Sequence, residues 1–406
     1  MRQVLHLLIV DAEHRSALAA PFAGRWLLPI LTCGERVRGD RHALRWATGR
    51  GLDVEVVGQW LGRVGTAATD WLMILSTTGP SNRKDPQLSW TPLGDLTPAA
   101  AVVDYQGWAV TRSLETGPLP SVSGPFGRIG WNAEVKAWIE RVNSGSCGCS
   151  VPYRTGPHEV VLGAQGVSGP VFFKGLSSEG GGEARLTRLL SGLEPSFFAR
   201  TIALEERADG TVWWLTAGCS GRPAFEGHVV GRALARVQRR VMSSPAVLRE
   251  LHALDVAGAF EWAERLVAAD SGRGVLQACH ETVTSAGVPR SWIPLDLDPV
   301  NVLAADSGEV RFIDLDDSFF GPAPLAMALF ARRSGDRSAY GVYEQSWRPI
   351  VTGLDWPGFE TAVAVLDAWL GWRRVECHTQ RGDLHGALAF AEARIRERLE
   401  RILHRR

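Results

Sequence analysis

The chain of 406 residues is poor in lysine, has no net charge and has no long hydrophobic run. Its acidic and basic side chains number 44 each, which argues against a nucleic-acid or anionic-membrane partner, because both usually select a basic surface. No stretch reaches the ~20 apolar residues of a membrane helix. The N-terminal segment predicts a first strand and lacks the pattern of a signal peptide. We therefore expect a cytoplasmic protein.

Cysteine and lysine are both scarce. The six cysteines are scattered, which predicts reduced thiols in a cytoplasmic chain. Cys147 and Cys149 could bind a metal or form a local disulfide, but no second Cys or His pair with zinc spacing accompanies them. Basic charge is almost all arginine, and Lys84, Lys136 and Lys174 are the only lysines. A lysine retained in such a chain is a candidate for a role that needs a compact ammonium group.

What is present is ordinary globular composition, with 45% hydrophobic and 22% charged residues. The length indicates two domains or one large two-lobed unit. Residues 1–115 alternate the strand-like runs VLHLLIV, LDVEVVGQWLG and DWLMILST with one helical stretch, RHALRWATGRG. We expect residues 116–127 to form a linker, because they are rich in Pro, Gly and Ser. An antiparallel sheet with an inserted helix is predicted for residues 128–218. A helical region follows over residues 219–406, with helical periodicity in RALARVQRRVM, FEWAERLVAA and FETAVAVLDAWLGW.

The residues that carry chemistry lie in the segment PLDLDPVNVLAADSGEVRFIDLDDS. Asp296 is followed by Asn301 and then by Asp314. Two short apolar segments joined by a turn separate Asn301 from Asp314, and a β-hairpin of that length brings its two ends together. Three oxygen-bearing side chains at one point suit Mg²⁺, and phosphoryl transfer needs a carboxylate that orients the attacking hydroxyl beside such a metal. The alternative interpretation is an acidic turn on a surface hairpin.

This segment resembles the catalytic loop of the aminoglycoside phosphotransferase family, within the protein-kinase-like fold. The family's loop reads His-Gly-Asp-Leu-x-x-x-Asn, and a later strand ends in Ile-Asp. The resemblance implies that Asp296 is the catalytic aspartate that positions the acceptor hydroxyl, and that Asn301 and Asp314 bind the metal. Two departures are visible. Pro294-Leu295 replaces His-Gly, and the acidic residue that the family carries soon after Gly-x-Pro is absent from GPAPLAMALF.

The other lobe of such a kinase needs a strand lysine that grips the nucleotide phosphates and a helix glutamate that holds this lysine. Lys174 lies near the end of the predicted strand VFFKGL, and Glu183 opens the next helix at the spacing that the resemblance implies. A surface ion pair is the alternative. The turn GAQGVSG before Lys174 is a weaker candidate for a phosphate-binding loop. The resemblance places the backbone contacts to adenine at Trp214, Leu215, Thr216 and Ala217.

Two further segments look similar to parts of the family pattern, and we reject both as site residues. Asp383 in RGDLH is not followed by an Asn or by an Ile-Asp strand, and we expect it to cap a helix. The pair Leu251-His252 resembles the helix that precedes the family's catalytic loop, and we expect His252 to pack within a helix.

The first domain is similar in layout to the Nudix hydrolase family, from a Trp-x-Leu-Pro strand end to the segment LSWTPLGDL. Alignment on Gly51 places that family's paired glutamates at Thr48 and Gly49, and its Arg-Glu pair at Leu44 and Arg45. None of these positions carries a carboxylate, so they cannot form the family's Mg²⁺ site. We expect the domain to bind the acceptor or a partner, or to pack against the kinase lobe.

The sequence thus predicts an α+β chain: a two-lobed protein-kinase-like fold preceded by a small α/β/α Nudix-like domain. The predicted activity is ATP- and Mg²⁺-dependent phosphorylation of a hydroxyl on a small molecule, which the resemblance makes an antibiotic or another natural product. A nucleotide-binding pseudokinase that acts as a regulatory or scaffold module is the alternative. An active Nudix-type hydrolase is a third, weaker hypothesis.

Overall fold

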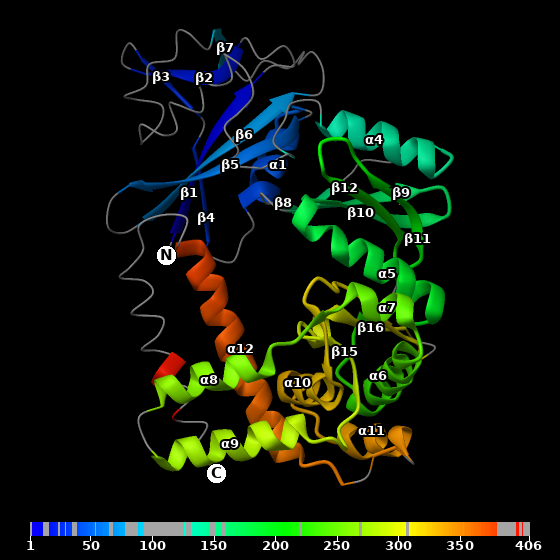
Figure 1. The fold of residues 1–406 in the computed structure, drawn as a ribbon. Helices are drawn as coiled ribbons and strands as arrows, with labels where there is room; N and C mark the ends of the chain where they lie inside the picture. The colour runs from blue at the N-terminus through cyan, green and yellow to red at the C-terminus, as the bar shows by residue number, and fades with distance from the viewer. Residues whose placement is uncertain are drawn as a thin grey trace. The chain divides into compact units, whose positions relative to one another are not determined.

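The computed structural model describes most of the chain (Figure 1). The described residues are 2–10, 16–22, 25–28, 30–34, 39–52, 54–64, 68–77, 88–92, 126, 131–145, 151–155, 159–219, 221–267, 270–305, 308–348, 350–351, 353–379, 395–397 and 400. The chain divides into two compact units. The first comprises Met1–Gly181 with Ile202–Gly218, and the second comprises Gly182–Thr201 with Cys219–Arg406.

The first unit begins with a mixed sheet around strand β1. Its elements are β1 (Arg2–Val10), β2 (Ser16–Phe22), β3 (Arg25–Leu27), β4 (Ile30–Gly34), α1 (Gly39–Gly49), β5 (Val54–Val64), β6 (Ala68–Thr77) and β7 (Ser89–Pro92). The strand β1 pairs antiparallel with β2 and β4 and parallel with β6. The side chains of Leu7 and Ile9 on β1 are buried with Ala43 and Ala47 of α1, so the helix covers an apolar sheet face.

The predicted elements of this region are confirmed: the strand runs VLHLLIV, LDVEVVGQWLG and DWLMILST fall on β1, β5 and β6, and the helical stretch falls on α1. The Nudix likeness stays a prediction. The predicted linker over residues 116–127 lies outside the described residues, apart from Phe126, and so do Cys147 and Cys149. The predicted domain boundaries likewise stay predictions.

The first unit also contains an antiparallel sheet of five strands. Its elements are α4 (Trp131–Val142), β8 (Val151–Thr155), β9 (Glu159–Gly166), β10 (Gly169–Leu176), η3 (Ser178–Gly180), β11 (Thr201–Glu206) and β12 (Val212–Ala217). The strand order is β11-β12-β10-β9-β8. Edge-to-face contacts join Trp131 and Trp138 of α4 to Phe173 and Trp213 of the sheet, at centroid distances of 5.7 to 6.2 Å. These rings form the core that fixes α4 on the sheet.

The second unit is mainly helical (Figure 1). Its helices are α5 (Gly181–Leu193), α6 (Gly227–Met242), α7 (Pro245–Glu250), α8 (Val256–Leu266), α9 (Asp270–Thr284), α10 (Pro324–Ser334), α11 (Ala339–Trp347) and α12 (Trp356–Thr379). Its short strands and 3₁₀ turn are β13 (Arg222–Pro223), β14 (His252–Ala253), β15 (Arg290–Pro294), η4 (Pro299–Asn301), β16 (Val302–Ala304), β17 (Val310–Phe312) and β18 (Ser318–Pro322). None of the helices among the described residues has the length and hydropathy of a membrane span.

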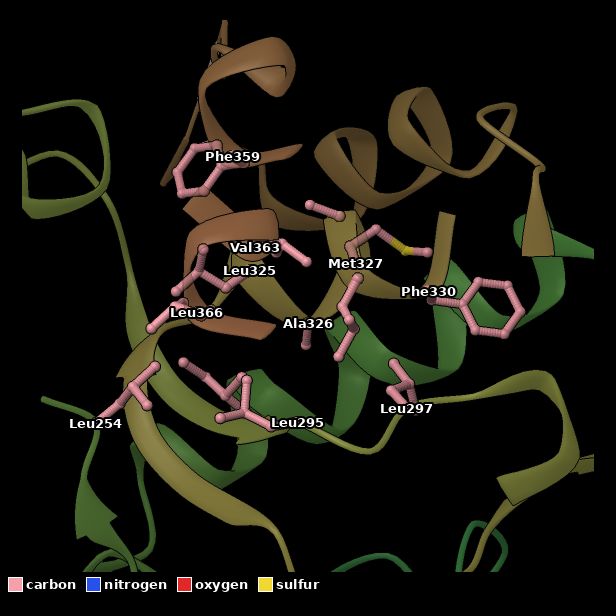
Figure 2. Close-up of a cluster of buried hydrophobic side chains, with 14 of the residues drawn as sticks. Leu254, Leu295, Leu297, Leu325, Ala326, Met327, Phe330, Phe359, Val363 and Leu366 are labelled. Atoms are coloured by element: carbon pink, nitrogen blue, oxygen red, sulfur yellow. The ribbon is translucent and has the colours of Figure 1, made fainter. Parts of the chain in front are cut away.

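Helix α10 is the centre of the helical unit. Its residues from Pro324 to Ala331 are all buried, because α11 and α12 pack around it. Figure 2 shows Leu325, Met327 and Phe330 of α10 among apolar side chains from α12 and from the chain after β15. A helix that is apolar on every side belongs inside a core. The buried part of α10 therefore holds the residues at the two ends of this helix in fixed positions.

A buried polar network ties α6 to its neighbours. The Gln238 amide donates to the carbonyl oxygens of Trp292 and Ala323 at 2.9 and 3.0 Å, and it accepts from the Tyr343 hydroxyl at 2.6 Å. The Ser291 hydroxyl donates to the Gln238 carbonyl at 2.6 Å. Because all these groups are buried and satisfied, the network fixes the positions of α6, β15, α10 and α11.

The mixed α+β class predicted from the sequence is confirmed, and the helices predicted around RALARVQRRVM, FEWAERLVAA and FETAVAVLDAWLGW fall on α6, α8 and α12. The expectation for His252 is wrong. This residue is exposed and lies in the short strand β14, which pairs parallel with β18. Asp383, predicted to cap a helix, lies outside the described residues.

Candidate active site

The loop around Asp296 is anchored by the two leucines beside it. Leu295 and Leu297 are buried, at 6% and 2% exposure, and both point into the α10 and α12 core (Figure 2). The chain turns at Leu295 and Asp296 directly after β15, and between the two buried leucines Asp296 keeps its side chain partly exposed. Its side chain is 42% exposed. The Leu295 amide also donates to the Asp317 carbonyl at 2.7 Å, which ties the loop to the start of β18.

Asn301 follows in the 3₁₀ turn η4. The Asp298 carboxylate caps this turn by accepting from the Val300 amide at 3.2 Å. The Asn301 amide nitrogen Nδ2 donates to both the carbonyl oxygen and the Oδ2 atom of Asp296, each at 2.9 Å. The side chains of Asp296 and Asn301 therefore meet, as the sequence predicts.

Asp314 reaches the same place through the hairpin of β16 and β17. Val302 pairs with Phe312, and beyond this pair the Ile313 amide donates to the Asn301 carbonyl at 3.0 Å. Asp314 is the next residue and has a φ of +59°, a left-handed conformation that is rare for residues other than glycine. Such a conformation costs free energy and occurs often at functional sites, where neighbouring contacts maintain it.

Arg333 is a site residue that the sequence did not reveal. It lies in the last turn of α10, and its Nη1 atom is 3.0 Å from Oδ1 of Asp296. Its Nη2 atom is 3.5 Å from Oδ1 of Asp367 on α12. The Arg333 and Asp367 side chains are each 24% exposed, so this charged group is largely shielded. Both carboxylate oxygens of Asp296 are thus engaged, one by Arg333 and one by Asn301.

Glu183 is buried in the first turn of α5, at 6% exposure. Its Oε1 atom accepts from the Leu315 backbone amide at 3.2 Å. This hydrogen bond connects α5 to the residue that follows Asp314, across 132 positions of sequence. The predicted partner of Glu183, Lys174, lies on β10 in the other unit, opposite Trp214. The ion pair between Lys174 and Glu183 stays a prediction.

The predicted nucleotide contacts lie on β12, between β10 and β11. Within this strand Trp214, Leu215 and Thr216 are buried, and the Thr216 hydroxyl donates to the Phe172 carbonyl at 3.4 Å. Adenine contacts from the backbone of Trp214 to Ala217 stay a prediction. The turn within GAQGVSG joins two paired strands through Val167 and Ser168, and Val167 is 67% exposed.

The two departures from the family pattern have structural counterparts. Where the family has the glycine of His-Gly, Leu295 fills the core instead, so this loop is held by apolar packing. Where the family has an acidic residue after Gly-x-Pro, α10 starts at Ala323 and Pro324 without a side-chain cap. The other end of the same helix provides a charged contact to the loop, through Arg333.

Asn301 and Asp314 fit a hard cation by their chemistry. Both hydrogen bonds of the Asn301 side chain use Nδ2, which leaves Oδ1 facing away from Asp296 as an oxygen donor. Asp314 adds a partly exposed carboxylate. Oxygen ligands of this kind suit Mg²⁺, which binds through one or two protein groups and completes its shell with water and phosphate. Among the described residues no cluster of three His, Cys, Asp or Glu side chains forms a separate metal site.

Comparison with known proteins gives distant structural similarity. No family model and no curated protein matches the sequence. The GDP complex of aminoglycoside 2'-phosphotransferase-IIIa is 12% identical with a TM-score of 0.47, over 68% of this chain and 99% of that one. Macrolide 2'-phosphotransferase MphH from Brachybacterium faecium is 16% identical with a TM-score of 0.45, over 67% and 97%.

A thermostable mutant of aminoglycoside phosphotransferase APH(4)-Ia, in a ternary complex with ADP and hygromycin B, is 12% identical with a TM-score of 0.43, over 67% of this chain and 98% of that one. The chain is thus distantly similar in structure to aminoglycoside and macrolide phosphotransferases. TM-scores this low do not assign a function to the site, which has to be inferred from the residues of this chain.

Proposed function

We propose that this protein is an ATP- and Mg²⁺-dependent phosphotransferase that acts on a hydroxyl group of a small molecule. The observation that carries the proposal is the convergence of Asp296, Asn301 and Asp314. The Asn301 amide donates to the Asp296 carboxylate at 2.9 Å, and the hydrogen bond from the Ile313 amide to the Asn301 carbonyl at 3.0 Å supports a position for Asp314 close to them. A carboxylate next to an oxygen-donor pair is what phosphoryl transfer to a hydroxyl requires.

Asp296 would orient the acceptor hydroxyl and accept its proton as the oxygen bonds to the γ-phosphorus and the bond to the ADP leaving group breaks. Its half-exposed carboxylate is accessible to an acceptor from solvent. Asn301 and Asp314 would hold Mg²⁺, which when bound neutralises charge on the phosphate oxygens. Most of the rate acceleration would come from positioning and from charge stabilisation.

Lys174 and Glu183 complete the proposed site. Lys174 would grip the phosphates with a compact charge, and Glu183 would hold Lys174. The bond from the Leu315 amide to Glu183 supports this role, because it fixes the glutamate relative to the residue next to Asp314. The backbone of β12 from Trp214 to Ala217 would contact the adenine ring.

The acceptor we propose is an antibiotic or another hydroxylated natural product, in a cytoplasmic enzyme. The predicted Nudix-like domain would bind the acceptor or a partner, or pack against the kinase lobe. It would not hydrolyse pyrophosphates, because Thr48, Gly49, Leu44 and Arg45 stand where that chemistry needs a carboxylate-bearing helix.

The test is an acceptor screen that follows ADP release with Mg²⁺ and a panel of hydroxylated antibiotics. On any acceptor that the wild type phosphorylates, Asp296→Ala should lower kcat by at least about 10²-fold, because it removes the general base. The matched control is Asp383→Ala, in the other Gly-Asp-Leu of the sequence, which should retain activity. Turnover that survives Asp296→Ala would refute the assignment of the base.

A nucleotide-binding pseudokinase is the second candidate, and one observation favours it. Arg333 and Asn301 already bind the two oxygens of Asp296, an arrangement that also suits a silenced base. This candidate predicts that ATP binds but that no acceptor is phosphorylated. Titration of ATP into the protein, run beside the acceptor screen, separates the two candidates.

A further inference from the structure

Helix α6 presents a row of arginines on its exposed face. Arg232, Arg236, Arg239 and Arg240 recur at intervals of four, three and one, which places them on one side of a helix. All four are exposed, whereas the opposite face is buried in the core. Arginine is common in this chain, so the row alone would be a solvated helix face.

The surface beside this row is hollowed, which distinguishes it from a plain helix face. Two adjoining hollows of about 660 and 760 Å³ share Arg236 and Arg239, and both lie within the helical unit. We call them together the α6 groove. Its walls are α6, the segment 193–197 after α5, the hairpin turn at 308–310 and the end of α11 at 345–348. Hollows of this size are typical of small-molecule sites.

The charges that line the α6 groove are unbalanced, although the whole chain has no net charge. Among the described residues that line the groove, the four arginines of α6 and Arg348 face two acidic side chains, Glu194 and Glu309. Among the described residues no acidic group lies within ion-pair distance of Arg232, Arg239 or Arg348. Cations that lack an internal partner and line one cavity select an anionic ligand.

Part of the groove is held in place before any ligand binds. Glu194 is buried at 7% side-chain exposure and pairs with Arg236 at 3.0 Å and Arg240 at 3.4 Å. The Arg236 guanidinium also lies 5.3 Å from the centroid of the Phe197 ring. Phe197 in turn accepts from the Phe312 amide at 2.8 Å, so its backbone is fixed to β17. A preorganised arginine loses less entropy when it binds a ligand.

We propose that the α6 groove binds a small molecule that carries two or more phosphate groups. Guanidinium groups match phosphate oxygens in geometry and charge. Arg232 and Arg239 are seven residues apart, about 10 Å along the helix, so a chain of linked phosphates can place one phosphate group at each arginine. The site contains none of Asp296, Asn301 or Asp314, and it does not depend on the proposed phosphotransfer.

The probe is inorganic tripolyphosphate, titrated calorimetrically into the full chain in Mg²⁺-free buffer at low ionic strength. The wild type should bind it, and Arg232→Gln with Arg239→Gln should weaken binding at least about tenfold, because two charge-assisted contacts are lost. The matched control is Arg249→Gln with Arg265→Gln, two exposed arginines outside the groove. The control should bind as the wild type does.

A third variant separates the groove from the proposed nucleotide site. Lys174→Gln removes the cation proposed to grip the nucleotide phosphates and should leave tripolyphosphate affinity unchanged, and loss of binding in this variant would overturn the proposal. Equal weakening in the groove pair and the control pair would show a general charge effect and would also overturn it. Failure of the wild-type protein to bind tripolyphosphate would also overturn the proposal. Circular dichroism of each variant checks that the fold is kept.

Discussion

Arg333 offers the sharpest test of how the loop around Asp296 works. The perturbation is Arg333→Gln, which removes the guanidinium that is 3.0 Å from Asp296 and 3.5 Å from Asp367. Asp296 then keeps one of its two side-chain contacts, the Asn301 amide at 2.9 Å. A reacting group displaced by about 1 Å can lose about 10²-fold in rate, so with one contact retained we expect kcat to fall about 10- to 100-fold.

The same change should cost little stability. Asp296 is 42% exposed, so water can replace much of the lost interaction, and we expect a loss of about 1 kcal/mol in the free energy of unfolding. The KM for ATP should stay near its wild-type value, because the described contacts of Arg333 are to Asp296 and Asp367 and include none of the residues proposed to bind the nucleotide. A large fall in kcat with small changes in stability and KM distinguishes positioning of Asp296 from general damage to the fold.

The assay is steady-state ADP release with an acceptor found in the screen, together with urea unfolding. Arg333→Lys should recover part of kcat, because it restores a charge without the second contact to Asp367. The matched control is Arg332→Gln, the exposed neighbour on the same helix. An unchanged kcat in Arg333→Gln would refute the positioning role. A higher kcat would show that Arg333 restrains Asp296 and would support a silenced base.

Three further predictions concern the support of the site. Leu295→Ala should lower the free energy of unfolding by about 3 kcal/mol, because it opens a cavity in the α10 core, and urea unfolding would contradict this if the loss were below about 1 kcal/mol. Gln238→Leu should cost about 3 kcal/mol or more by leaving buried carbonyls and the Tyr343 hydroxyl without partners, whereas Tyr343→Phe should cost only about 1 kcal/mol. Hydrogen bonds from Ser338 and from the Gly227 amide lower the pKa of Asp336, so its stabilising contribution is complete above about pH 4 and disappears as the pH falls through the lowered pKa. Asp336→Asn should remove this part of the acid dependence of unfolding, and an unchanged slope of stability against pH would contradict it.

The sequence was most informative where the residues of a site lie close together in the chain, or where a hydrophobic pattern repeats over neighbouring positions. Asp296, Asn301 and Asp314 are separated by one turn and one hairpin, so their meeting follows from local geometry. The helices α6, α8 and α12 were predicted because their apolar residues repeat with the helical period over many positions. The motif around Asp296 could therefore be located before any tertiary contact was known.

Contacts across long sequence distances could not be predicted in this way. Arg333 reaches Asp296 over 37 positions, and one arginine in a chain with so many of them carries no local signal. Glu183 binds Leu315 over 132 positions, through a backbone amide that no sequence pattern marks. His252 was expected in a helix, but pairing with β18 draws it into a strand, which is a tertiary override of local preference.

The measurement that tests the central claim most directly is mass spectrometry of the acceptor after incubation with ATP and Mg²⁺. The proposed function predicts an acceptor that gains one phosphoryl group with the wild-type protein. It predicts no gain with Asp296→Asn or Asp314→Asn, and none when the metal is chelated. ATP binding without a phosphorylated product on any hydroxylated acceptor, or a product that still forms with Asp314→Asn, would contradict it.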